Sequence, residues 1–338
     1  MKLPTAEEIS QSLEDLLRRP AQVPARPRAS EASKPRSPRF KIKKVERKRG
    51  DRRNLLARAI TGVSLAGLTV LLIVVHPYAF AFEAMFFVAI SIKEVCDIAA
   101  RNGIDASFPV ALLSGLSIVS VATWMPARTP DVLVLCVLVS MVVTIFRKRG
   151  TGGDGVHRRR YVDGIVTIYA FLYVAWLFSF CLQIRFTPGT VPGPNGARVE
   201  AGAALLLMLI ATTALSDVGC YFSGKLFGRH ALAPAISPGK TIEGSLGGVL
   251  VSTLTAVAFG CWIGLDLEAC AVYGVVMSVV AQLGDLWESM MKREAGVKDS
   301  GRALAGHGGA LDRFDSFFFA MPVGYLLTQG LLLAGRSL

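Results

Sequence analysis

A dense group of acidic and basic residues lies between Asp285 and Asp315, in the segment that separates two long apolar stretches of the chain. The helix that ends the first stretch is predicted to carry one polar face, because four residues fall at helical spacing: Asp285, Glu288, Ser289 and Lys292. Asp312 and Asp315 follow at i and i+3, where the next apolar stretch begins. Because proteins hold Mg²⁺ between carboxylates and substrate phosphates, we predict Asp285, Asp312 and Asp315 as its ligands.

Cationic and glycine residues in the same segment are suited to binding phosphate. Lysine and arginine donate strong hydrogen bonds to phosphate oxygens, and glycines let backbone amides approach an anion closely. The candidate cations are Lys292, Arg293, Lys298 and Arg313. Further candidates for substrate contact are Ser289, His307, Gly308 and Gly309, with His307 either orienting a phosphate or shaping the glycine turn. These residues together predict a metal-dependent phosphate site.

A second polar segment comes earlier in the chain, at residues 216–244. Asp217 lies within an apolar stretch, where a charge is costly and by default functional. Ser237, Lys240 and Thr241 stand between two expected helices. We interpret them as part of a glycine and serine turn that presents Lys240 to an anion, and we predict all four residues as substrate contacts.

Two motifs in these segments resemble the phosphatidate cytidylyltransferases, also called CDP-diacylglycerol synthases. The longer motif reads S-x-x-K-R-x4-K-D-x7-H-G-G-x-x-D-R-x-D and runs from Ser289 to Asp315. The shorter reads D-x-G-x-Y-x-x-G-K, followed by S-P-x-K-T-x-E-G, within residues 217–244. Ala305 replaces a proline that is usual in that family, and Gly239 replaces a usual lysine, which removes one expected cation. The resemblance covers roughly residues 215–316.

The resemblance implies an enzyme that transfers a cytidylyl group from CTP to phosphatidate, giving CDP-diacylglycerol and pyrophosphate. It also implies Mg²⁺, a monovalent cation such as K⁺ beside it, and a homodimer, with no nucleic-acid partner. A CTP-dependent polyprenol kinase would use similar residues but would transfer the γ-phosphoryl group. A transporter would also hold charges within its spans, but its binding helices should break near the bilayer midplane, whereas the charges here gather at one predicted surface.

The composition is typical of a polytopic membrane protein and not of a soluble domain. The chain has 338 residues, of which 52% are hydrophobic and 18% charged, and its mean hydropathy is +0.48. We predict an all-α fold of about nine transmembrane helices with a polar catalytic cavity that faces the cytoplasm. The six cysteines are scattered through apolar stretches without C-x-x-C spacing, which argues against a zinc site or a disulfide framework.

The expected membrane spans are apolar stretches near the ~20 residues that cross a bilayer. They are 57–76, 78–100, 107–124, 130–146, 162–184, 201–223, 244–265, 268–290 and 315–334. Before them, residues 1–53 are predicted to form a basic, mostly disordered tail, and residues 54–338 a transmembrane catalytic domain.

The distribution of basic residues predicts the orientation of the chain. The net charge is +12, and lysines and arginines concentrate in the tail and in the connections after residues 146, 223 and 290. By the positive-inside rule, these segments lie in the cytoplasm, so the N-terminus and the active site are expected there. The expected compartment is the inner membrane of a bacterial cell.

Overall fold

The computed structural model describes residues 51–147, 156–193, 197–301 and 309–335, with side chains for residues 62–147, 160–193, 197–301 and 309–332. The chain divides into two compact units, 1–48 and 49–338, and every described residue belongs to the second. The side chains of the predicted tail, residues 1–53, lie outside the described ones, and so do His307 and Gly308. The boundary between tail and catalytic domain stays a prediction.

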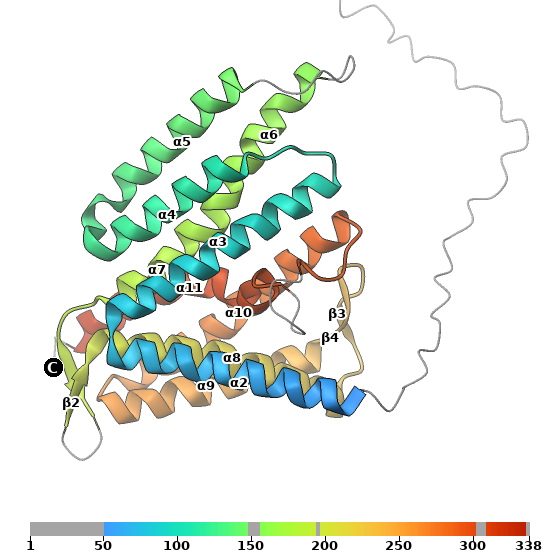
Figure 1. Ribbon diagram of the computed structural model, residues 1–338. Helices are drawn as coiled ribbons and strands as arrows, with labels where there is room; N and C mark the ends of the chain where they lie inside the picture. Colours follow the sequence, from blue (N-terminus) through green and yellow to red (C-terminus); the bar gives the residue numbers. More distant parts are fainter. Residues whose placement is uncertain (1–50, 148–155, 194–196, 302–308, 336–338) are drawn as a thin grey trace, which may run out of the picture. The chain divides into compact units, whose positions relative to one another are not determined.

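Each of the nine predicted spans corresponds to a helical segment in the described part of the chain (Figure 1). The helices are α2 (Asp51–Val75), α3 (Pro77–Arg101), α4 (Phe108–Trp124), η1 (Pro126–Arg128), α5 (Thr129–Phe146), α6 (Val156–Phe171), η2 (Leu172–Trp176), α7 (Leu177–Arg185), α8 (Ala201–Phe227), α9 (Ile242–Ile263), α10 (Leu267–Glu294) and α11 (Leu311–Gly335). The fifth predicted span is made of α6, the π-helical η2 and α7 in direct succession. The mostly helical fold class is therefore confirmed.

Several of these helices have the length and composition of membrane spans. Among the described residues, five helical segments are long and apolar enough to cross a bilayer by these criteria. They are Pro126–Phe146, Arg160–Arg185, Ala201–Phe227, Ile242–Ile263 and Leu267–Glu294. Two shorter apolar helices cover Gly62–Val75 and Phe108–Trp124. This pattern indicates a polytopic membrane protein.

Local capping signals explain where the helices nearest the polar segments begin and end. Thr241 starts α9 by accepting a hydrogen bond from the amide of Gly244 at 3.1 Å. Gly264 ends α9 with φ of 71°, a left-handed conformation that glycine adopts without strain. Asp266 then starts α10 by accepting from the amide of Ala269 at 2.8 Å. Of these caps, Thr241 lies in the connection beside the candidate site, whereas Gly264 and Asp266 form the α9–α10 connection at the opposite end, near Pro192 of β1.

Two short antiparallel hairpins correct the purely α-helical prediction. Strands β1 (Thr190–Pro192) and β2 (Arg198–Glu200) pair in the connection before α8, and β3 (Ala231–Ala233) pairs with β4 (Ser237–Thr241) in the connection before α9. Ser237, Lys240 and Thr241 therefore lie on a strand and not in the predicted turn, because the backbone of β4 pairs with β3. Figure 1 shows the two hairpins at opposite ends of the helices.

Small residues let α8 and α9 pack closely along the segment that carries the second motif. A Cβ atom on Gly247 would fall on the Ser223 side chain, and one on Gly248 would fall on the sulfur of Cys220. Gly219 faces the backbone of α9 in the same way, since its Cβ would lie 3.0 Å from the carbonyl oxygen of Gly247. Close contact through small residues is a common way for membrane helices to associate.

Aromatic side chains position α11 inside the bundle. Phe314 packs against Phe87 of α3, with ring centroids 5.0 Å apart, and against Phe178 of α7 at 5.5 Å. One turn later, Phe318 lies 5.0 Å from Tyr173. Because these rings are large and their contacts directional, they fix the rotation of α11 about its axis, and with it the direction of the acidic residues in its first turns.

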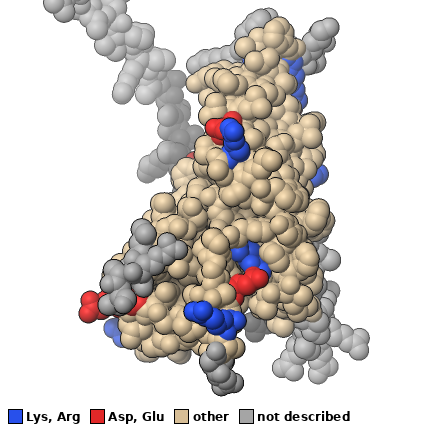
Figure 2. All heavy atoms as spheres, turned by 90° about the vertical axis from the view of Figure 1, so that its left-hand side faces the viewer, with Lys and Arg blue, Asp and Glu red and all other residues tan. Residues whose placement is uncertain are grey.

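Charge is distributed unevenly over the bundle. Figure 2 views the end that carries β2, and most of the surface seen there belongs to neither basic nor acidic residues. The described ion pairs near this end include Arg128 with Asp131, at 3.1 Å, and Arg185 with Glu200, at 2.8 Å. The predicted catalytic residues lie toward the opposite end, which carries β3 and β4 (Figure 1).

Candidate active site

The candidate site lies where the end of α10 meets the start of α11. Gly284 permits a close approach of the two helices, because a Cβ atom there would lie 2.6 Å from the backbone oxygen of Asp315. Asp285, the next residue, is near enough to Asp315 for their carboxylates to repel each other. The structure thus brings together two of the three acids that the sequence predicts as metal ligands.

Lys292 connects α10 to α11 through two ion pairs. Its Nζ lies 2.7 Å from Oδ1 of Asp312 and 3.0 Å from Oε1 of Glu288, one turn earlier on α10. Glu288 is 0% exposed, and its Oε2 has no hydrogen-bond partner among the described residues. A buried carboxylate is costly without compensation, so Lys292 stabilises Glu288 as well as orienting Asp312.

Asp312 has protein donors on both of its carboxylate oxygens. While Oδ1 accepts from Lys292, Oδ2 accepts from the amide of Ser300 at 2.9 Å and from the amide of Gly309 at 3.0 Å. We predicted that the backbone amide of Gly309 approaches an anion. In the structure that anion is the carboxylate of Asp312. This arrangement holds Asp312 in one orientation.

Strand β4 supplies the second lysine of the site. The Nζ of Lys240 lies 2.5 Å from Oδ2 of Asp285, and both side chains are partly buried. Ser289, one turn after Asp285, donates its hydroxyl to Oδ1 at 3.3 Å. This ion pair joins β4 to α10, although 45 positions separate the two residues in the sequence.

Asp217 joins the same group of acids from α8. The hydroxyl of Ser316 donates to Oδ2 of Asp217 at 3.1 Å and lies 3.4 Å from Oδ1 of Asp315. Asp217 is also near enough to Asp285 for electrostatic repulsion between the two carboxylates. The intramembrane acid that the sequence singles out therefore faces the predicted metal ligands.

Other predicted site residues lie at the edge of this cluster or outside it. Arg293 is exposed and donates from Nε to the carbonyl oxygen of Ile236 at 3.3 Å. Lys298 and Arg313 are exposed, and Ser237 is half-buried in the β3–β4 hairpin. The hydroxyl of Thr241 caps α9, so a structural role explains the presence of threonine at this position.

Sequence reasoning did not place four residues that complete the cluster among the site residues: Glu94, Glu288, Ser300 and Ser316. Glu288 and Glu94 each stand in an apolar stretch, and an acid in such a place is a functional signal that applies to them as it does to Asp217. The two serines carry no comparable signal, because serine is common in membrane helices and loops.

The donor chemistry of the cluster fits a hard divalent cation. Carboxylates outnumber lysines, and the group contains only oxygen and ammonium groups; its members are Asp217, Asp285, Glu288, Asp312, Asp315, Lys240 and Lys292. The buried Oε2 of Glu288 lacks a donor among the described residues. Within the described part of the chain, however, no three acidic, histidine or cysteine side chains form a ready metal-binding group. Carboxylate oxygens are the ligand type that Mg²⁺ takes, but the described acids do not converge on one point as a ready site would.

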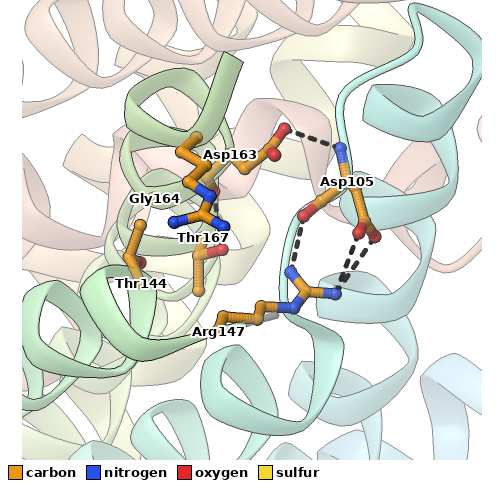
Figure 3. A pocket seen from close by; sticks show the side chains of 7 residues that line it. Asp105, Thr144, Arg147, Asp163, Gly164 and Thr167 are labelled. Carbon is orange, nitrogen blue, oxygen red and sulfur yellow. Dashed lines mark hydrogen bonds and ion pairs between the residues drawn. The ribbon is translucent and has the colours of Figure 1, made fainter. Parts of the chain in front are cut away.

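A second charged cluster lies at the ends of α3, α5 and α6 and lines a small pocket (Figure 3). Arg147 donates to the carbonyl oxygen of Asp105 at 2.7 Å and pairs with its carboxylate at 3.1 Å. The amide of Asp105 donates in turn to Oδ1 of Asp163 at 2.8 Å. With Arg160 also lining the pocket, two acids face two arginines. This cluster is balanced in charge, unlike the one at α10 and α11.

Most of the chain matches a known protein family. A model described as the cytidylyltransferase family matches residues 56–331. The chain belongs to this family. The match includes every residue of the carboxylate and lysine cluster, and it confirms the resemblance drawn from residues 215–316. It also extends to the first half of the cytidylyltransferase chain, where the sequence alone offers only hydrophobicity.

Curated relatives carry a more specific name. Proteins named phosphatidate cytidylyltransferase from Staphylococcus aureus (strain COL) and Staphylococcus epidermidis (strain ATCC 12228 / FDA PCI 1200) are 38% and 47% identical to this chain over 169 residues. One from Staphylococcus saprophyticus is 35% identical over the same length. The aligned part is 49% of this chain and 60% of each relative, so the chain spans about 60% of the length of the curated relatives it matches.

Proposed function

We propose that this protein is a phosphatidate cytidylyltransferase, which converts CTP and phosphatidate to CDP-diacylglycerol and pyrophosphate. The observation that carries the proposal is the gathering of Asp285, Asp312, Asp315, Lys240 and Lys292 in one cluster of a cytidylyltransferase-family chain. The name of the staphylococcal relatives supports the choice of substrates.

The proposed reaction is a single displacement at phosphorus. A phosphate oxygen of phosphatidate forms a bond to the α-phosphorus of CTP, the bond from that phosphorus to the bridging oxygen breaks, and pyrophosphate leaves with the electron pair. A phosphate monoester is largely ionised at neutral pH, with its second pKa at about 6, so a strong general base is not required. No covalent intermediate with the protein is needed either.

The residues of the cluster contribute charge and position. Two anionic substrates must meet, so cations that bind phosphoryl oxygens and departing pyrophosphate should dominate catalysis. Lys240 and Lys292 sit at the centre of the cluster, each paired with an acid that a bound nucleotide would compete with. Arg293, Lys298 and Arg313 stand at its exposed edge, where they are suited to guide the triphosphate toward the lysines.

The proposal includes Mg²⁺ held by Asp285, Asp312 and Asp315, where it would neutralise charge on the phosphates of CTP. A monovalent cation such as K⁺ beside it belongs to the same proposal. The excess of carboxylates supports this assignment, because acids that repel one another in a partly buried place favour a bound cation. The ammonium groups of Lys240 and Lys292 would then turn from the acids toward the nucleotide.

We also propose that the protein lies in the inner membrane, that its polar catalytic cavity faces the cytoplasm, and that it works as a homodimer. The distribution of charge supports this orientation, because the described basic residues concentrate at the end of the bundle that carries β3 and β4. They include Arg101, Arg147, Lys225, Arg229, Lys240, Lys292, Arg293 and Lys298. Excess lysine and arginine mark cytoplasmic connections.

The test is transfer of label from [α-³²P]CTP into extractable lipid by purified protein with phosphatidate and Mg²⁺. The proposal expects labelled CDP-diacylglycerol from the wild type and a large loss in Asp312→Asn. Label that enters lipid only from [γ-³²P]CTP, with a polyprenol as acceptor, would instead identify a lipid kinase. Folded protein that labels no lipid from either nucleotide would refute the proposed function.

A further inference from the structure

Glu94 of α3 is a buried carboxylate that reaches the first turn of α11. It is 4% exposed. Its Oε1 accepts from the amide of Ala310 at 3.0 Å, and its Oε2 accepts from the amide of Leu311 at 2.8 Å and from the hydroxyl of Ser300 at 3.1 Å. The first amides of a helix have no partner within the helix and favour an anion. Glu94 therefore caps α11 from a different helix.

Glu94 and Asp312 accept hydrogen bonds from the same two places in the connection between α10 and α11, Ser300 and the pair Gly309–Ala310. Ser300 gives its hydroxyl to Glu94 and its amide to Asp312. On the other side of the connection, Gly309 gives its amide to Asp312, and Ala310, the next residue, gives its amide to Glu94. A shift of Glu94 would therefore move both backbone groups that orient Asp312.

Two glycines show how tightly the backbone surrounds Glu94. A Cβ atom on Gly301 would overlap Oε1 of Glu94, and one on Gly309 would overlap both the Ser300 hydroxyl and the Glu94 carboxylate. In the part of the chain that the structure describes, no lysine or arginine pairs with Glu94, and hydrogen-bond donors surround it instead. Its contribution is thus one of geometry.

We propose that Glu94 is a positioning residue for the cytidylyl transfer. It fixes the first turn of α11 and the Ser300 backbone, whose amides hold the carboxylate of Asp312 in one orientation. The inference rests on the proposed function, because it assigns Asp312 to the reacting site. It also gives the N-terminal half of the chain a direct part in that site, through a residue that lies outside both motifs.

The decisive experiment is a double-mutant cycle of Glu94→Gln with Asp312→Asn, measured as kcat and KM in the labelling assay. Glutamine keeps the size of the side chain but turns an amide donor toward backbone N–H groups, so the first turn of α11 loses part of its anchor. We expect kcat to fall roughly 10- to 100-fold with little change in KM for CTP. In the Asp312→Asn background, the same change should lower the residual rate far less.

The outcomes separate this inference from the proposed function. Wild-type protein that labels no lipid refutes the function. If the wild type is active but Glu94→Gln lowers kcat by the same factor in the Asp312→Asn background as in the wild-type background, the two residues act independently. That result overturns only the role of Glu94. Where the rate of Asp312→Asn falls below detection, Asp312→Glu replaces it in the cycle.

Matched variants guard against a trivial loss of folding. Asp97→Asn, on the same helix, removes an acid that pairs with Lys93 at the exposed surface at 2.7 Å, and it should leave kcat unchanged. If Glu94→Gln does not fold, Ser300→Ala takes its place, because it deletes one donor to Glu94 and keeps the amide that binds Asp312. A Ser300→Ala variant whose loss of kcat multiplies with that of Asp312→Asn would equally refute the inference.

Discussion

The two charged clusters of this protein differ in balance. At the ends of α3, α5 and α6, two acids, Asp105 and Asp163, line a small pocket with two arginines, Arg147 and Arg160, so the formal charges are equal in number. At the ends of α10 and α11, carboxylates gather around two lysines, and several of the acids repel one another. Folding alone favours the first arrangement, because paired charges lose less on burial. The excess of acid in the second cluster is the feature on which the proposed cation and anionic substrate rest.

The clusters also differ in how the chain assembles them. The balanced cluster draws on neighbouring helices between residues 105 and 167. The acid-rich cluster draws on α3, α8, β4, α10 and α11, and its longest contact joins residues 217 positions apart. Substitutions in the two clusters should therefore have different consequences.

The largest effect is expected for Lys292→Met. This change leaves the buried carboxylate of Glu288 without its counter-ion, and breaking a buried pair in this way costs about 3–5 kcal/mol of stability. Thermal unfolding in detergent measures the loss. Adding Glu288→Gln to the variant should restore most of the stability but not the activity. A single variant as stable as the wild type would show that Glu288 needs no counter-ion, and the contrast between the clusters would fail.

Asp312→Asn should reduce kcat for cytidylyl transfer by roughly 10²- to 10³-fold, because it removes charge from a preorganised polar site. The matched change in the balanced cluster, Asp163→Asn, should act on stability, with a cost of about 1–3 kcal/mol, and spare kcat in the protein that remains folded. Equal losses of kcat in the two variants would mean that both clusters serve the reaction.

Lys240→Gln should have a moderate effect. It removes the partner of Asp285 and one cation for the nucleotide, so KM for CTP should rise roughly tenfold, which corresponds to about 1.4 kcal/mol. Lys93→Gln, on the exposed face of α3 and outside both motifs, provides the control, since the described contact of that lysine is an exposed ion pair with Asp97 at 2.7 Å. A rise in KM of the same size in the control would reduce the role of Lys240 to general attraction of anions.

The smallest effect is expected for Arg147→Gln. Arg147 and Asp105 have side chains that are 36% and 53% exposed, so their ion pair should contribute only about 0–1 kcal/mol to stability. Labelling activity should stay at the wild-type level. A marked loss of activity with stability retained would show that this second cluster takes part in the reaction, contrary to the prediction drawn from its balanced charge.

Sequence reasoning predicted the helices well because the length of an apolar stretch is a local property. It singled out Asp217, Asp285, Asp312 and Lys240 because charges in apolar stretches and motif spacing are visible without a fold, and their roles stay predictions. It could not predict that β4 would pair with β3, since Ser237 to Thr241 contains proline and glycine and has no alternating pattern.

Contacts across long stretches of sequence were beyond local reasoning. Glu94 could be suspected from its apolar surroundings but not assigned to the α11 cap, because helix rotation and packing decide which distant amides it meets. The same holds for Ser300 and Ser316, whose side chains gain a role only from the acids placed beside them. The family match reaches the N-terminal half but names no contact within it.

The link between Glu94 and the start of α11 has a consequence for biosynthesis. The two partners Glu94 and Ala310 are 216 residues apart, so a ribosome that adds about 5–20 residues per second makes the second roughly 10–40 s after the first. During that interval α3 exists without the donors that its carboxylate will accept. The site can therefore assemble only when α11 emerges, and a nascent chain stopped before α11 carries the motif lysines without their final geometry.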